Sequence, residues 1–271
     1  MAEERIRTRA EDGIYYVGLN RPEKRNAITL EMLAEFPKAI TAAEGMPDVR
    51  AILVYGEGRG FSSGIDFESL GDLAAFGSDE KVDGGLARHF RSVAYRNQTL
   101  LSSVEACELP VVGAIHGFCI GLGLELALLC DLLVASEETF FALPEGTLGL
   151  VTDCGGATRL SRRVTPGHAK ELLFTGKRVS AARAAEIGIV NHVVPAGEHV
   201  KKAVEIINEM RNVSPLAVGL YKRIVDQGRH LSREDQLGLE AWAQSMMLKS
   251  EDFKEGVRSK LERRPPKWQA K

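Results

Sequence analysis

The segment from residue 111 to residue 131 restricts the possible folds of this chain most strongly. It begins with the wholly apolar run VVGAI, which directly follows Pro110 and is typical of a buried strand. Three glycines, at positions 117, 121 and 123, come next, and the stretch LELALL is apolar on nearly every side. We therefore predict a buried strand, a glycine turn and a buried helix, in this order.

Glu125 is the one charged residue within the predicted helix, and it lies in the first turn. The turn before it can offer free backbone N–H groups and the positive end of a helix dipole to a developing negative charge. The alternative is a glycine-rich packing turn, in which Glu125 neutralises its own helix end. Taken alone, the segment favours the packing turn.

The other predicted elements divide the 271 residues into two parts. Strands are predicted at residues 14–20, 51–56, 131–136 and 189–194, whereas the pattern is helical from residue 197 onward. We expect an α/β core with the active site in residues 1–196 and a helical C-terminal region in residues 197–271.

Local signals refine this division. Asp12-Gly13 predicts a hairpin turn, and Thr29 predicts the N-cap of a helix that Pro37 is expected to kink or shorten. Residues 68–81 are polar and contain glycine, which indicates a mobile flap. Residues 139–164 indicate a long loop that runs into a helix.

Composition excludes several classes of protein. The net charge is −2 and no basic block is present, so the sequence indicates neither nucleic-acid nor membrane binding. No apolar run approaches the ~20 residues of a membrane span. The charged N-terminal segment fits no secretory or organellar signal, and we expect a cytoplasmic protein with buried free thiols at its four cysteines. The histidines lack the spacing of a metal site, and no dinucleotide-binding GxGxxG motif occurs.

The loop FSSGID, residues 61–66, follows the predicted strand at residues 51–56. Ligands of α/β proteins bind at the carboxyl ends of such strands, where the N–H of Ile65 can point into a cleft. Together with the N–H of Leu122, it would form an oxyanion hole, in which each donor stabilises a transition state by about 3–4 kcal/mol. Taken alone, this loop favours the alternative, which is a tight turn between a strand and a helix.

Glu145 and Asp153 lie in a stretch that is otherwise largely apolar. With Glu125 they make three carboxyl groups whose pKa values burial and mutual repulsion would raise, as general acid–base catalysis requires. The alternatives are that Asp153 caps the helix that follows it and that Glu145 is an exposed loop residue. The sequence favours these alternatives and the catalytic interpretation about equally.

Several separate motifs, in this order along nearly the whole chain, resemble those of the crotonase, or enoyl-CoA hydratase/isomerase, family. They are NRPEKRNAIT (20–29), FSSGID (61–66), HGFCIGLGLELALLCD (116–131), PEGTLGL (144–150), LFTGKRVSAARAAEIGIVNHVV (173–194) and SEDFKEGVRSKLERRPPKW (250–268). The resemblance implies an α/β fold made of a spiral of ββα turns, followed by a helical trimerisation region. It also implies an acyl-CoA thioester substrate, a homotrimer or dimer of trimers, and no metal or redox cofactor.

The resemblance also assigns roles to individual residues. The backbone N–H groups of Ile65 and Leu122 become the oxyanion donors, and Glu125 and Glu145 become the acid/base pair. The contacts to coenzyme A, which enters as part of the substrate, are expected from Lys24, Arg25, Ala27, Ser63, Gly64, Ile65 and Asp66.

Asp153 distinguishes this chain from a typical hydratase, which has glycine there. An acid at this position resembles the dienoyl-CoA isomerases, as do GLVTDCGG (149–156) and AWAQSMM (241–247). In that subgroup the acids matching Glu145 and Asp153 move protons at opposite ends of a conjugated system. The subgroup usually has Asp in place of Glu125 and Gly in place of Leu122, so the match is incomplete.

We therefore expect isomerisation of an unsaturated acyl-CoA, most specifically of a Δ3,5-dienoyl-CoA to the Δ2,4 isomer. Hydration of a 2-enoyl-CoA by Glu125 and Glu145 is the close alternative. Hydrolysis or decarboxylation through the same enolate, and thioester binding without efficient catalysis, are more distant alternatives.

Overall fold

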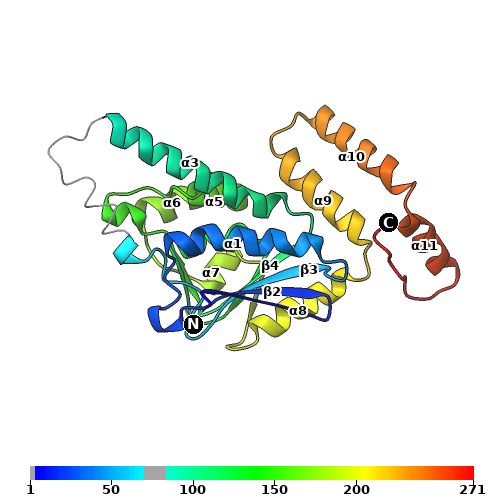
Figure 1. Ribbon diagram of the computed structural model, residues 1–271, viewed down its shortest axis with the longest axis horizontal. Helices are drawn as coiled ribbons and strands as arrows, with labels where there is room; N and C mark the ends of the chain where they lie inside the picture. Colours follow the sequence, from blue (N-terminus) through cyan, green and yellow to red (C-terminus); the bar gives the residue numbers. More distant parts are fainter. Residues whose placement is uncertain (1–3, 70–83) are drawn as a thin grey trace.

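The computed structural model describes residues 4–69 and 84–271, and helices cover both faces of its large sheet (Figure 1). The strand order is β1-β2-β3-β4-β6-β9, and every neighbouring pair is parallel except β1 with β2. The strands are β1 (Ile6–Glu11), β2 (Ile14–Leu19), β3 (Ala51–Gly56), β4 (Val111–Ile115), β6 (Leu132–Ser136) and β9 (His192–Val194). The four predicted strands and the hairpin turn, where Asp12 and Gly13 have φ of 48° and 73°, are confirmed.

The central strands are wholly apolar because both of their faces are buried. Successive side chains point to opposite faces, so Leu53 and Val112 pack with α8 (His199–Met210), whereas Ile52 and Val111 belong to the larger core on the other face. Both core clusters therefore draw on the same strands.

A second, three-stranded sheet lies after β4 and was missed by the sequence analysis. Its order is β5-β7-β8, with β5 (Phe118–Ile120), β7 (Phe140–Ala142) and β8 (Val179–Ser180). The glycine turn predicted after residue 115 thus contains a strand, and the loop predicted from residue 139 begins with another. Strands of two or three residues are too short to show a period, so the sequence could not predict them.

The helices of the core cover this framework. They are α1 (Leu30–Ala42), α3 (Gly84–Ala106), α4 (Leu122–Ala127), α5 (Gly156–Arg163), α6 (Pro166–Thr175), α7 (Ala181–Glu186) and α8, with short 3₁₀ turns η1 (Pro22–Lys24), η2 (Ala43–Gly45) and η3 (Glu145–Leu148). Thr29 caps α1 as predicted, since its side chain accepts the N–H of Met32, and α1 continues past Pro37 to Ala42. The buried helix of the central segment is shorter than predicted, because α4 ends at Ala127.

Three further helices follow α8, namely α9 (Pro215–Gly228), α10 (Arg233–Met247) and α11 (Glu251–Leu261), and they extend to one side of the sheet (Figure 1). The Lys222 ammonium of α9 pairs with the Asp131 carboxylate at 3.0 Å and joins this region to the end of the central segment. The division at residues 196 and 197 stays a prediction, and α8 beyond it packs on the sheet.

Three other expectations concern the cysteines, the predicted flap and membrane-spanning segments. Cys107, Cys119, Cys130 and Cys154 are buried free thiols, as predicted. The predicted flap lies almost entirely outside the described residues. In the parts of the chain that the structure describes, no helix has both the length and the apolar character needed to span a bilayer.

Candidate active site

The FSSGID loop presents one backbone donor, as predicted. Ile28 N–H donates to the carbonyl of Gly64 at 2.8 Å, and the N–H of Asp66 donates to the carbonyl of Ile28 at 2.9 Å. Because a trans peptide points its C=O and N–H in opposite directions, the N–H of Ile65 points away from Ile28. Within residues 4–69 and 84–271 this N–H makes no hydrogen bond, so it is free to bind a ligand oxygen.

The first residue of α4 presents the second donor. The carbonyl of Gly121 accepts the N–H of Glu125 at 3.0 Å, so the N–H of Leu122 points out of the helix beginning. Gly121 has φ of 54°, which favours glycine, and a Cβ there would lie 4.0 Å from the Cα of Gly64. The structure thus brings the peptides of Ile65 and Leu122 close together, as the predicted oxyanion hole requires.

Asn26, which the sequence analysis did not select, organises the segment that supports the first donor. Its side-chain amide donates to the carbonyls of Glu57 and Gly60 at 2.8 and 2.9 Å and accepts the N–H of Arg21 at 2.8 Å. Asn26 also has φ of 53°, a conformation that Asn tolerates better than most residues. An asparagine in a turn, directly after the basic residues Lys24 and Arg25, was the available signal.

The Glu125 side chain is only 2% exposed and binds the loop that contains Asp153. Its Oε1 accepts the N–H groups of Cys154 and Gly156 at 3.1 and 2.7 Å. The pKa of Glu125 is raised to about 8, mainly by burial and in smaller part by the charges of Glu145 and Asp153, although the N–H groups of Gly156 and Cys154 oppose the rise. Glu125 therefore binds α5 at its N-terminus rather than serving only its own helix.

Glu145 faces the oxyanion turn from η3. Its Oε1 lies 3.0 Å from the position that a Cβ on Gly121 would occupy. Its Oε2 is buried and has no hydrogen-bond partner among the described residues. Burial raises the pKa of Glu145 and the charge of Asp153 raises it further, although the backbone N–H of Glu145 opposes the rise. The exposed-loop alternative is wrong for Glu145.

Asp153 does not cap α5, and this alternative is also wrong. The N-cap is Gly155, which has no side chain, and Glu125 accepts the N–H of Gly156 at the first helical position. Asp153 is partly exposed, and burial raises its pKa against the opposing effects of its own N–H and the Cys154 thiol. Its carboxyl group is therefore available for chemistry.

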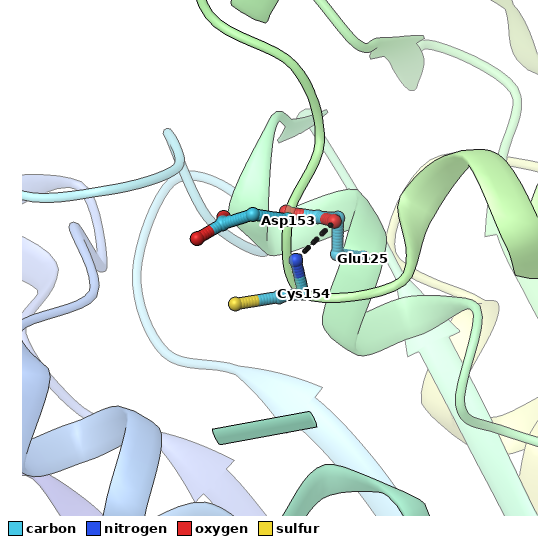
Figure 2. Close-up of side chains that lie close together, drawn as sticks. All are labelled: Glu125, Asp153 and Cys154. Atoms are coloured by element: carbon cyan, nitrogen blue, oxygen red, sulfur yellow. Dashed lines mark hydrogen bonds between the residues drawn. The ribbon is translucent and has the colours of Figure 1, made fainter. Parts of the chain in front are cut away.

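Glu125, Asp153 and Cys154 form a compact cluster (Figure 2). One oxygen or sulfur atom from each lies within 4.8 Å of the other two. A cation at this position would need deprotonated ligands, whereas burial raises the pKa of all three groups. The cluster is therefore better suited to retaining and transferring protons.

The predicted coenzyme A contacts lie together on one edge of the site. The N–H of Ser63 donates to the carbonyl of Arg25 at 3.0 Å, which joins the segment of Lys24, Arg25 and Ala27 to the FSSGID loop. The carboxylate of Asp66 is mostly buried and accepts the Arg21 guanidinium at 2.8 Å, a hydrogen bond that lowers the pKa of Asp66. This carboxylate is thus already paired, which favours a supporting function for Asp66.

The comparison with known proteins agrees with this geometry. Residues 9–271 match the family described as enoyl-CoA hydratase/isomerase, and the chain belongs to this family, the crotonases. The fold is that of its solved members. A putative enoyl-CoA hydratase/isomerase family protein from Hyphomonas neptunium superposes with a TM-score of 0.89 at 30% identity, covering 99% of this chain and 98% of that chain.

Relatives with two different activities in their names are similarly distant. A peroxisomal Δ(3,5)-Δ(2,4)-dienoyl-CoA isomerase of Arabidopsis thaliana is 34% identical, over 97% of this chain and 95% of that protein. A crotonyl-CoA hydratase of Syntrophomonas wolfei is 33% identical, over 97% of each. The chain is therefore an enzyme of the enoyl-CoA hydratase/isomerase family, and the choice between these reactions depends on its own site.

Proposed function

We propose that this protein is a dienoyl-CoA isomerase, which converts a 3,5-dienoyl-CoA to the 2,4-dienoyl-CoA. One observation carries this choice: Glu125, and not Asp153, binds the N–H groups that begin α5. The Asp153 carboxyl group is therefore not used as a helix cap, and its charge raises the pKa of both Glu145 and Glu125. Two available acids suit a reaction that moves a proton between two distant carbons.

The proposed reaction proceeds through a thioester enolate. One of the two acids, as its carboxylate, removes a proton from C2, and the electron pair of the C2–H bond forms the C1–C2 double bond of an enolate with its negative charge on the thioester oxygen. The N–H groups of Ile65 and Leu122 stabilise the negative charge on this oxygen. The electron pair then returns from the enolate oxygen through the conjugated system, and C6 takes a proton from the other acid. Double bonds are left at C2 and C4, and no oxidant, reductant or water is consumed.

Hydration of a 2-enoyl-CoA is the second candidate function. The Glu125 and Glu145 pair matches the hydratase pattern, and the names of several relatives are those of hydratases. In this chain, however, one oxygen of Glu125 already accepts two N–H groups, which reduces its capacity to orient water. We therefore expect hydration to be the slower reaction. Thioester binding without efficient catalysis is less consistent with three buried or partly buried acids.

The substrate is proposed to bind through its coenzyme A part along the segment of Lys24, Arg25 and Ala27 and the FSSGID loop. The backbone of Ser63, Gly64 and Ile65 lines the inner end of this edge. Assembly as a homotrimer or a dimer of trimers, and a cytoplasmic location, stay predictions.

Parallel assays of a 3,5-dienoyl-CoA and a 2-enoyl-CoA test the proposal. We expect the wild-type protein to isomerise the first substrate faster than it hydrates the second. Asp153→Asn should lower isomerisation by about 100-fold or more, as is typical for loss of a general acid or base, and should leave the slower hydration nearly unchanged. Asp48→Asn, at a surface turn, serves as the control. Unimpaired isomerisation in Asp153→Asn, or hydration faster than isomerisation in the wild type, would contradict the proposal.

A further inference from the structure

Arg159 of α5 is a buried cation directly behind the loop that carries Asp153. Its side chain is 8% exposed; Nη1 donates to the carbonyl of Cys154 at 2.7 Å, and Nη2 donates to the Glu105 carboxylate of α3 at 2.7 Å. Gly155 makes this approach possible, because a Cβ there would lie 1.9 Å from Nη1. Any residue larger than glycine would displace the guanidinium.

Other side chains bind the same loop from the remaining sides. Gln98 of α3 donates to the carbonyl of Asp153 at 2.7 Å, and Glu125 of α4 accepts the N–H groups of Cys154 and Gly156. Helix α3 thus acts on the carbonyls of two successive residues. Its Gln98 binds that of Asp153, and its Glu105 orients the Arg159 guanidinium that binds that of Cys154. The Asp153 backbone is fixed on both sides. Its carboxyl group projects away from Glu125 in Figure 2, although one of its oxygens stays within 4.8 Å of a Glu125 oxygen and the Cys154 sulfur.

The arrangement is not the one that stability alone would favour. The Nε of Arg159 is buried and has no hydrogen-bond partner within residues 4–69 and 84–271. An unsatisfied buried donor costs stability, as does the desolvation of a buried ion pair. The two bonds that the guanidinium does make are directed at the loop and at the helix that supports it.

We propose that Arg159, oriented by Glu105 and assisted by Gln98, is a positioning residue for Asp153. This inference rests on the proposed function, in which Asp153 transfers a proton at one end of the dienoyl group. Arg159 binds the main chain next to Asp153 and sets where the carboxyl group lies relative to the substrate carbon. Proton transfer is sensitive to such placement, since a displacement of about 1 Å can lower the rate by ~100-fold.

The test compares Arg159→Lys with Arg162→Lys, the same change three residues later on the exposed side of α5. Arg159→Lys keeps the charge, but a lysine cannot bind the Cys154 carbonyl and the Glu105 carboxylate in the geometry of the guanidinium. We therefore expect kcat for isomerisation to fall by about 10-fold, with KM changed less than 2-fold. Arg159→Met should lower kcat further, and Arg162→Lys should match the wild type. Thermal unfolding of each variant establishes that it folds.

Two further variants make the result independent of folding at α5. Gln98→Leu removes an exposed bond to the loop and should lower kcat by roughly 3-fold, whereas Ser102→Ala, which removes a bond within α3, should not. In the Asp153→Asn background, Arg159→Lys should have no additional effect on kcat. A full additional 10-fold loss of kcat in that background would overturn the inference, as would equal kcat in Arg159→Lys and Arg162→Lys. Neither result bears on the proposed function, which Asp153→Asn alone tests. If Asp153→Asn isomerises normally, the proposed function fails, and this inference fails with it.

Discussion

One half of the proposed active site consists of backbone groups, and the other half consists of side chains. The oxyanion half consists of main chain, the Ile65 and Leu122 peptides, which parallel-strand hydrogen bonds and glycines bring together. The acid half consists of the side chains of Glu125, Glu145 and Asp153, and hydrogen bonds from α3, α4 and α5 orient its loop. We therefore propose that the first half serves any reaction that forms an enolate, whereas the second half selects the reaction.

The acid half should be the more sensitive to a single substitution. Glu145→Gln keeps the shape of the side chain and removes its ability to exchange a proton, so turnover of both test substrates should fall by roughly 1,000-fold. Steady-state kinetics measures this loss, and Glu137→Gln, on an exposed residue before β7, is the control. A loss smaller than 10-fold would show that Glu145 is not an acid or base in either reaction.

The oxyanion half can be disturbed without changing any acid. Gly121→Ala places a methyl group 3.0 Å from the Glu145 carboxylate at a positive φ, so it should displace the Leu122 N–H. Loss of one such donor lowers kcat by about 100-fold to 1,000-fold, and we expect the lower end for a displaced donor. Gly146→Ala is the matched control, because a Cβ at Gly146 has only ordinary contacts. Equal activity in the two variants would show that Leu122 N–H is no donor.

The junction between the oxyanion half and the predicted coenzyme A edge gives a smaller effect. Asp66→Asn removes the carboxylate that pairs with Arg21, which leaves a mostly buried guanidinium without its counter-charge. We expect KM for acyl-CoA substrates to rise by roughly 3-fold to 10-fold, with kcat nearly constant and the melting temperature lowered. Asp235→Asn on the exposed part of α10 is the control. An unchanged KM would show that Asp66 does not contribute to substrate binding.

The smallest predicted effect concerns stability and pH. The folded-state pKa of Glu125 is about 8, above its ordinary value of 4.5, so its contribution to stability is complete below about pH 4.5 and is lost as pH rises toward 8. Glu125→Gln can still accept both N–H groups and lacks this loss. Its melting temperature relative to the wild type should therefore be a few degrees higher at pH 8.5 than at pH 5. A pH-independent difference would show that Glu125 is not buried with a raised pKa.

The oxyanion half could be predicted from the sequence because its signals are local. The Ile65 donor lies in FSSGID, which follows a wholly apolar strand. The Leu122 donor lies among the three glycines that follow another apolar strand. The short strands β5 and β7 were missed, since three residues show no period.

The acid half could be predicted only in part. The resemblance identified Glu125, Glu145 and Asp153, but the sequence alone left open that Asp153 caps α5. The structure excludes this, because Gly155 is the N-cap and Glu125 accepts the N–H of Gly156. Such a bond joins residues about 30 positions apart, and no local pattern encodes it. The same holds for Gln98 and Arg159, whose partners lie on other elements.

Isomerisation of a 3,5-dienoyl-CoA in deuterium oxide tests the central claim, that two different acids act at the two ends of the substrate. An acid that exchanges with solvent before it donates should place deuterium at C6 of the 2,4-dienoyl product, which mass spectrometry and NMR detect. Complete transfer of the original C2 hydrogen to C6 would mean that a single acid moves the proton. A 3-hydroxyacyl-CoA as the main product of a 2-enoyl-CoA, with no isomerisation of the dienoyl substrate, would contradict the account as a whole.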